Sequence, residues 1–161
     1  MGLFDALKKK KEPEGPKTLP ADHTLHKEDF PVVGIVYHEK AVKRLQVARE
    51  DYRASAKKNV EDGLAGQKIF RYDYVNKPVD LIPEPDNTRD RNAVMVRIAG
   101  EHVGYISTED NVHVLEILRF GSVKYITARI TGGEYKVVSE NGDAVKLDGG
   151  VRINVRIAYS V

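Results

Sequence analysis

The amino-acid sequence predicts a mainly β domain with two helices, an α+β fold. Apolar and polar side chains alternate in most segments after residue 66, only two segments space their apolar residues three or four apart, and turns with Gly or Asn separate the segments. A chain of 161 residues can enclose one hydrophobic core but is short for two. We expect a flexible tail at residues 1–30, which is rich in Lys, Pro and Gly, and one domain at 31–161.

The first half of the expected domain contains one strand and one long helix. The segment PVVGIVY, residues 31–37, predicts a buried strand that ends at Tyr37, and Gly34 within it allows another backbone or a ligand to approach closely. Residues 39–62 have apolar residues at helical spacing and no Pro or Gly before Gly63. They predict an extended helix.

The second half predicts strands on both sides of a short helix. The helix covers residues 107–121, with Ser107 and Thr108 as candidate N-caps and Gly121 as its end. Residues 92–98 and 102–106 are expected to pair as a hairpin. The remaining predicted strands are 67–75, 78–82, 122–130, 134–139 and 151–161. So many short antiparallel strands favour a small closed or nearly closed β-barrel of the OB or SH3 kind.

Composition excludes several classes of protein. The chain has 26 Lys and Arg against 24 Asp and Glu, a net charge of +2, so it is not a general polycation and any anion site must be local. It has no cysteine, which excludes disulfides, thiolate zinc sites and a cysteine nucleophile. No apolar run approaches the roughly 20 residues of a membrane span, and the N-terminus lacks the apolar core of a secretory signal. We expect a soluble, cytoplasmic protein with no membrane partner.

The segment EPDNTRDRNAVMV, residues 84–96, places three carboxylates and two asparagines directly before an apolar strand. A metal cage is one interpretation. A calcium loop that began at Asp86 would need Gly at its sixth position and Glu at its twelfth, where this chain has Arg91 and Arg97. His23 and His26 are spaced as ligands, but no further ligand lies near them in the sequence. We therefore expect neither a metal nor a cofactor.

Catalysis and a rigid loop are the other two interpretations. Glu84, Asp86 and Asp90 could hold Mg²⁺ for phosphodiester cleavage, but no second acidic cluster, Walker lysine loop or GxSxG motif accompanies them. We expect no enzymatic activity. Pro83 and Pro85 restrict the backbone, and Asn and Asp side chains bond to nearby amides, so a stiff polar loop is favoured.

Four blocks in one order carry a family resemblance. They are VVGIVY, VDLIPEPDNTRDRNAVMV, GEHVGYI and an apolar helix that ends in FG. In this order the chain resembles the HIRAN domain, which occurs at the N-terminus of some DNA-remodelling helicases and as a free-standing bacterial protein. The resemblance implies an OB-like barrel that binds single-stranded DNA and, in helicase members, captures a free 3′ end.

The resemblance also implies roles for individual residues. Tyr37 would stack on a terminal base, Asp90 would accept a hydrogen bond from the 3′-hydroxyl, and Asn87 would be a further loop contact. The chain departs from the family where Arg89 replaces a second stacking aromatic, and where Tyr105 replaces a basic residue or His. Both side chains can stack on a base.

A basic segment suggests where phosphates would bind. Residues 40–58 contain seven basic and two acidic residues, a net charge of +5. A basic helix face is usually a solvated surface. Because this one follows Tyr37, we hypothesise that Lys43, Arg44 and Arg49 bind the phosphates of the strand.

Three functions remain open at this point. The leading one is a non-enzymatic module that binds single-stranded DNA or its 3′-hydroxyl ends in DNA repair or processing, with a helicase or another DNA-processing protein as partner. A protein-interaction barrel without end recognition is the alternative. A Mg²⁺-dependent nuclease is the weaker one.

Overall fold

A computed structural model describes residues 25–74 and 78–161 of the chain. Its centre is a seven-stranded antiparallel sheet with the order β3-β8-β9-β1-β7-β6-β5, beside a separate two-stranded sheet of β2 and β4. The predicted mainly β fold is confirmed.

The elements alternate between short segments and two long strands. The sheet strands are β1 (His26–Val33), β3 (Lys68–Phe70), β5 (Val79–Pro83), β6 (Val94–Ile98), β7 (Glu101–Ile106), β8 (Ser122–Val138) and β9 (Ala144–Ser160), and the small sheet has β2 (Gln46–Ala48) and β4 (Tyr72–Tyr74). The helices are the 3-10 helix η3 (Ile35–His38), α2 (Glu39–Arg44), α3 (Glu50–Arg53), α4 (Ala56–Glu61) and α5 (Asn111–Phe120).

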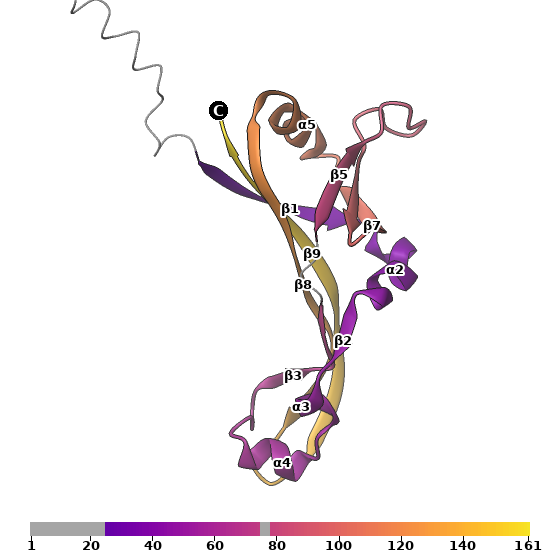
Figure 1. The fold of residues 1–161 in the computed structure, drawn as a ribbon. Coiled ribbons are helices and arrows are strands. Elements are labelled where there is room, and N and C mark those ends of the chain that lie inside the picture. Colours follow the sequence, from indigo (N-terminus) through magenta and orange to yellow (C-terminus); the bar gives the residue numbers. More distant parts are fainter. Residues whose placement is uncertain (1–24, 75–77) are drawn as a thin grey trace, which may run out of the picture.

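The paired strands β8 and β9 form a long ribbon that extends along the molecule (Figure 1). Helix α5 and strands β5 and β7 lie at one end of this ribbon, whereas α3, α4 and β3 lie at the other. Strand β1 pairs with β9 through residues 26–31 and with β7 through Val32 and Val33. It therefore joins the ribbon to the β5-β6-β7 half of the sheet.

The core lies on one face of this sheet. In β9, Ile153, Val155 and Ile157 are buried, and the residues between them are exposed, as expected for a strand with one face on the core. Val94 and Val96 of β6 and the apolar side of α5 pack into the same cluster. The predicted hairpin of β6 and β7 and the predicted second helix are confirmed.

The expected closed barrel is not found. In the described part of the chain, β3 and β5 are the two edges of an open sheet, and no strand pairing joins them. The length of β8 and β9 accounts for this, because a pair of 17-residue strands extends well beyond the short strands that would have to curl around and close it.

The expected long helix at residues 39–62 is wrong. The segment instead forms α2, the short strand β2, α3 and α4. Val47 lies in β2 and is paired with Asp73 of β4, so this stretch satisfies its backbone groups in a sheet. Ser55 then starts a new helix, because its hydroxyl accepts a hydrogen bond from the Lys58 amide.

Two other predicted boundaries also differ. The predicted strands 122–130 and 134–139 form one strand, β8. Gly132 and Gly133 form a bulge within it, and pairing with β9 continues on both sides of the bulge. Strand β1 begins at His26, inside the expected tail, and Phe30 is buried; residues 1–24 lie outside the described part. Tyr37 lies in η3 and not at the end of a strand.

Among the described helices, none combines the length and the apolar composition required to span a bilayer.

Replacing Gly104 by Ala tests the junction between β1 and β7. An added Cβ would lie 2.4 Å from the Val33 carbonyl oxygen and 2.8 Å from Val32 Cγ1, at a φ of 153°. We expect the free energy of unfolding to fall by about 3 kcal/mol, as measured by urea denaturation.

The matched control is Gly142→Ala in the turn after β8, where φ is 90° but no atom lies within 4 Å. Its free energy of unfolding should fall by only about 1 kcal/mol, through backbone strain. Equal losses in the two variants would show that close packing of β1 on β7 is not the cause.

Candidate functional site

A groove of about 730 Å³ lies where the end of β1, the loop at residues 84–93 and β7 meet. Five of the eight residues predicted to bind DNA line it. They are Tyr37, Asn87, Arg89, Asp90 and Tyr105. The structure thus brings together side chains that are far apart in the sequence.

The loop at residues 84–93 is held by its own polar side chains. The Asn87 amide oxygen accepts hydrogen bonds from the backbone amides of Arg89 (3.0 Å) and Asp90 (3.2 Å), and its Nδ2 donates to Glu84 Oε1 (3.1 Å). The Glu84 amide donates to the Ala93 carbonyl at 2.9 Å and closes the base of the loop. These bonds are the short-range Asn and Asp contacts that make a loop stiff.

Asp90 connects this loop to α5. Its Oδ1 accepts from the Asn92 amide at 2.8 Å, and its Oδ2 accepts from Asn111 Nδ2 at 2.7 Å. Asn111 is the first residue of α5 and is 2% exposed. A carboxylate offers about four acceptor positions, so each Asp90 oxygen keeps capacity for one more donor. Asp90 is among the residues that line the groove.

Tyr37 is presented to solvent by a turn. Gly34 has a φ of 78°, a left-handed conformation that favours glycine, and its carbonyl accepts from the Tyr37 amide at 3.0 Å. The turn starts η3, and the Tyr37 side chain is 85% exposed at the edge of the groove. An aromatic ring left so open is available to stack on a flat partner.

Two histidines were not predicted as site residues: His38 lines the groove, and His102 lies next to Tyr105. The rings of His38 and His102 lie 4.0 Å apart, and the His102 ring meets the edge of Tyr105 at 5.0 Å. Burial, and then His38, lower the pKa of His102. Burial, and then the Glu84 carboxylate, raise the pKa of Tyr105. The hairpin pattern could have placed His102 near Tyr105, but no sequence signal brings in His38.

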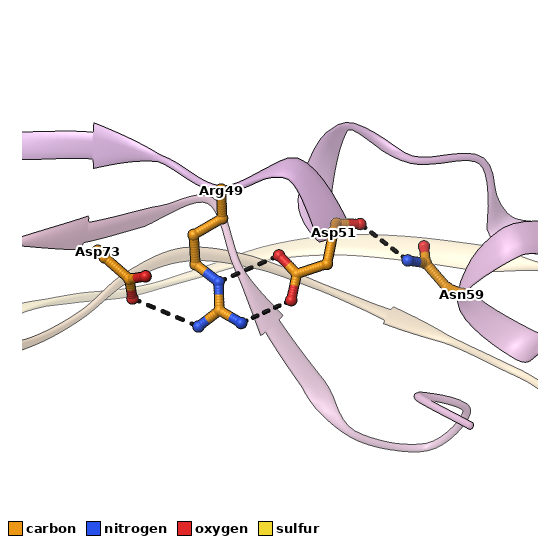
Figure 2. A network of polar contacts seen from close by, with 4 residues as sticks. All are labelled: Arg49, Asp51, Asn59 and Asp73. Atoms are coloured by element: carbon orange, nitrogen blue, oxygen red, sulfur yellow. Dashed lines mark hydrogen bonds and ion pairs between the residues drawn. The ribbon is translucent and has the colours of Figure 1, made fainter. Parts of the chain in front are cut away.

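Arg44 and Arg49, which were predicted to bind phosphate, are held in ion pairs outside this groove. Arg44 lies 3.0 Å from Glu101. Figure 2 shows the Arg49 guanidinium between Asp51 and Asp73, with nitrogen to oxygen distances of 2.5 Å and 3.4 Å. Its hydrogen bonds are the main cause that lowers the pKa of Asp51.

The buried Asn59 extends this network, because its Nδ2 donates to the Asp51 carbonyl at 2.8 Å (Figure 2). Arg49 thus joins the start of α3 to β4, which is a structural role. Lys43 lines a separate hollow of about 780 Å³ with Val36 and Tyr72. None of the three basic residues is among those that line the groove.

Metal ligands are not grouped in the described residues, where no three His, Asp or Glu side chains lie close enough to hold an ion. The sequence model of the HIRAN domain matches residues 66–148, about half of the chain. The chain belongs to the HIRAN domain family. Comparisons with curated proteins and with solved structures find no match.

HIRAN domains are generally associated with DNA binding. The matched segment contains the polar loop, the β6-β7 hairpin, α5, all of β8 and the beginning of β9. It includes Asn87, Arg89, Asp90 and Tyr105 and begins after Tyr37. The part of the groove that the HIRAN match covers is therefore the loop and β7, and Tyr37 is added to it by the turn at Gly34.

Replacing Arg49 by Gln separates its structural role from a role in DNA binding. We expect the free energy of unfolding to fall by at most about 1 kcal/mol, because the ion pairs are partly open to solvent. The affinity for DNA and its dependence on salt should not change. Chemical denaturation and fluorescence anisotropy measure the two quantities.

The control is Arg53→Gln, which removes the same charge at an exposed position of α3. It should leave stability unchanged. A weaker salt dependence in Arg49→Gln, with stability preserved, would contradict the structural assignment.

Proposed function

We propose that this HIRAN protein binds single-stranded DNA in the groove beside β7 and that the groove recognises the 3′-hydroxyl end. The observation that carries the proposal is that Tyr37, which is 85% exposed, and Asp90 line the same groove. One offers a stacking surface for a base, and the other offers an acceptor for a hydroxyl.

Stacking explains why the strand would be unpaired. A base can reach the Tyr37 ring only when it is released from a duplex, and stacking on one aromatic is worth about 1–3 kcal/mol per base whatever the sequence. Tyr105 lines the groove as a second ring, and Arg89 adds a planar cation able to stack or to meet a phosphate.

The charges of the groove favour an end over an internal position. Its lining includes Asp86 and Asp90 but only one arginine, Arg89. A carboxylate accepts a hydrogen bond from a hydroxyl and repels a phosphate. An internal phosphodiester beside Asp90 would be disfavoured, whereas a terminal 3′-hydroxyl fits both its charge and its remaining acceptor capacity.

We further propose that the protein acts without catalysis. A Mg²⁺-dependent nuclease would use Glu84, Asp86 and Asp90, and in the described part of the chain no three acidic or His side chains are grouped closely enough to hold an ion. A role in DNA repair or processing, a helicase or similar protein as partner, and a cytoplasmic location belong to the same proposal.

The end preference is testable by fluorescence anisotropy. One oligonucleotide should be compared as its 3′-hydroxyl and its 3′-phosphate form, with and without Mg²⁺. We expect the hydroxyl form to bind about tenfold more tightly, since a phosphate would face Asp90, and the strand to keep its length. Equal affinity for both forms would refute end recognition. No binding of either would favour a protein-interaction role, and shortening of the strand with Mg²⁺ would favour a nuclease.

Two substitutions separate stacking from end recognition. Tyr37→Ala should weaken the binding of both the 3′-hydroxyl and the 3′-phosphate oligonucleotide about tenfold, because the stacking surface is lost. Asp90→Asn should instead reduce the preference between the forms, because the repulsion of phosphate is lost. Asp86→Asn is the matched control, an exposed carboxylate of the same groove that should keep the preference. Thermal unfolding of each variant checks that the loop remains folded, since Asp90 also bonds Asn92 and Asn111.

A further inference from the structure

The strand register defines a solvent-exposed face on β1, β9 and β8, which we call the outer face. Residues directly opposite each other in an antiparallel pair point to the same side. Asp29, Arg156 and Thr127 form one row across the three strands, and Pro31, Asn154 and Arg129 form the next. Arg152 and Thr131 continue the face beyond the end of β1.

The outer face carries mainly positive charge. Its ionisable residues on the paired strands are four cations and one carboxylate, namely Lys27, Arg129, Arg152, Arg156 and Asp29. Within the described chain, only Arg156 among these cations forms an ion pair, at 2.7 Å from Asp29. An ordinary solvated face interleaves both signs. A face with one sign in a chain of net charge +2 is a local concentration of positive charge.

The side chains between these cations suit a polar, flexible ligand. Tyr125 is 42% exposed beside Thr127 on β8, and Asn154 lies between Arg152 and Arg156. A hollow of about 670 Å³ is lined by five residues of the outer face, Asp29, Thr127, Arg129, Asn154 and Arg156, together with the core-side residues Tyr74, Ala128 and Ile130.

The outer face is continuous with the groove. Val33 pairs with Tyr105 and lies two residues after Pro31, so these side chains are on the same side of the sheet. Both Val33 and Tyr105 line the groove. From Tyr105 to Arg129 the path crosses three strand spacings, on the order of 15 Å.

We infer that the outer face binds the phosphate backbone of the same single strand whose 3′ end occupies the groove. The inference rests on the proposed function and extends it. The groove itself is lined by two carboxylates and one arginine, so it supplies little attraction for phosphates. Arg129 and Arg152 lie beyond it on the same side of the sheet, where the preceding nucleotides would run. The charge of the outer face complements a phosphate backbone and is indifferent to base sequence.

The test is the double variant Arg129→Gln/Arg152→Gln with strands of two lengths. Strands of about 4 and about 16 nucleotides, both with a 3′-hydroxyl, are titrated by fluorescence anisotropy at several salt concentrations. For the long strand we expect an affinity loss of about fivefold to tenfold near 0.1 M salt, and a salt slope lower by about 1.4, from about 0.7 per lost phosphate contact. The short strand should bind as it does to the unchanged protein.

Two further variants keep the test specific. Arg129→Lys/Arg152→Lys retains the charge and should retain the salt slope. Lys57→Gln/Arg119→Gln removes two charges from exposed positions of α4 and α5. It should change the affinity for neither oligonucleotide.

The outcomes distinguish this inference from the proposed function. Unchanged binding of the long strand by Arg129→Gln/Arg152→Gln overturns the outer-face inference alone, as does an equal effect on both strands or an equal loss in the control. Failure of the unchanged protein to bind the short strand overturns the proposed function.

Discussion

The arrangement of the strands in this protein depends on β1, which pairs first with β9 and then with β7. Its first six residues pair with β9, and only Val32 and Val33 pair with β7, so two residue pairs join the halves of the seven-stranded sheet. Gly104 makes this junction possible, because any Cβ there would collide with the β1 backbone. The same junction places Tyr105 beside Val33, and the chain then continues directly into the turn at Gly34. The groove forms where β1 changes its pairing from β9 to β7.

The distribution of charge follows from which cations find a carboxylate. The most basic part of the sequence, residues 40–58, uses Arg44, Arg49 and Lys58 in ion pairs. These pairs tie α2 to β7, connect α3 to β4, and brace α4. By contrast, Arg129 and Arg152 point outward from long strands with no carboxylate directly opposite them. Charge density along the chain is therefore a poor guide to charge available for a ligand, because pairing depends on three-dimensional neighbours.

Local interactions explain the parts of the fold and site that could be predicted. The stiffness of the polar loop arises from Asn87 and Asp90 bonding amides two or three residues away, and such contacts can be inferred from residue order. The β6-β7 hairpin likewise follows from alternation and a short turn. The helix predicted over residues 39–62 is wrong because its apolar residues have different environments. Val42 and Leu45 are buried in the core, whereas Val47 lies in a strand and pairs with β4, and periodicity alone does not distinguish these environments.

The sequence by itself determined the β-rich class, the hairpin, the second helix and the rigid loop ahead of β6. Each of these depends on interactions between residues close in the chain. Tertiary structure alone decided the open sheet, the contact of Asp90 with Asn111, the contact between the His38 and His102 rings, and the continuity of the groove with the outer face. These features join segments separated by tens of residues. Their geometry is set by the long β8-β9 ribbon and by the register of β1 upon it, which no local pattern encodes.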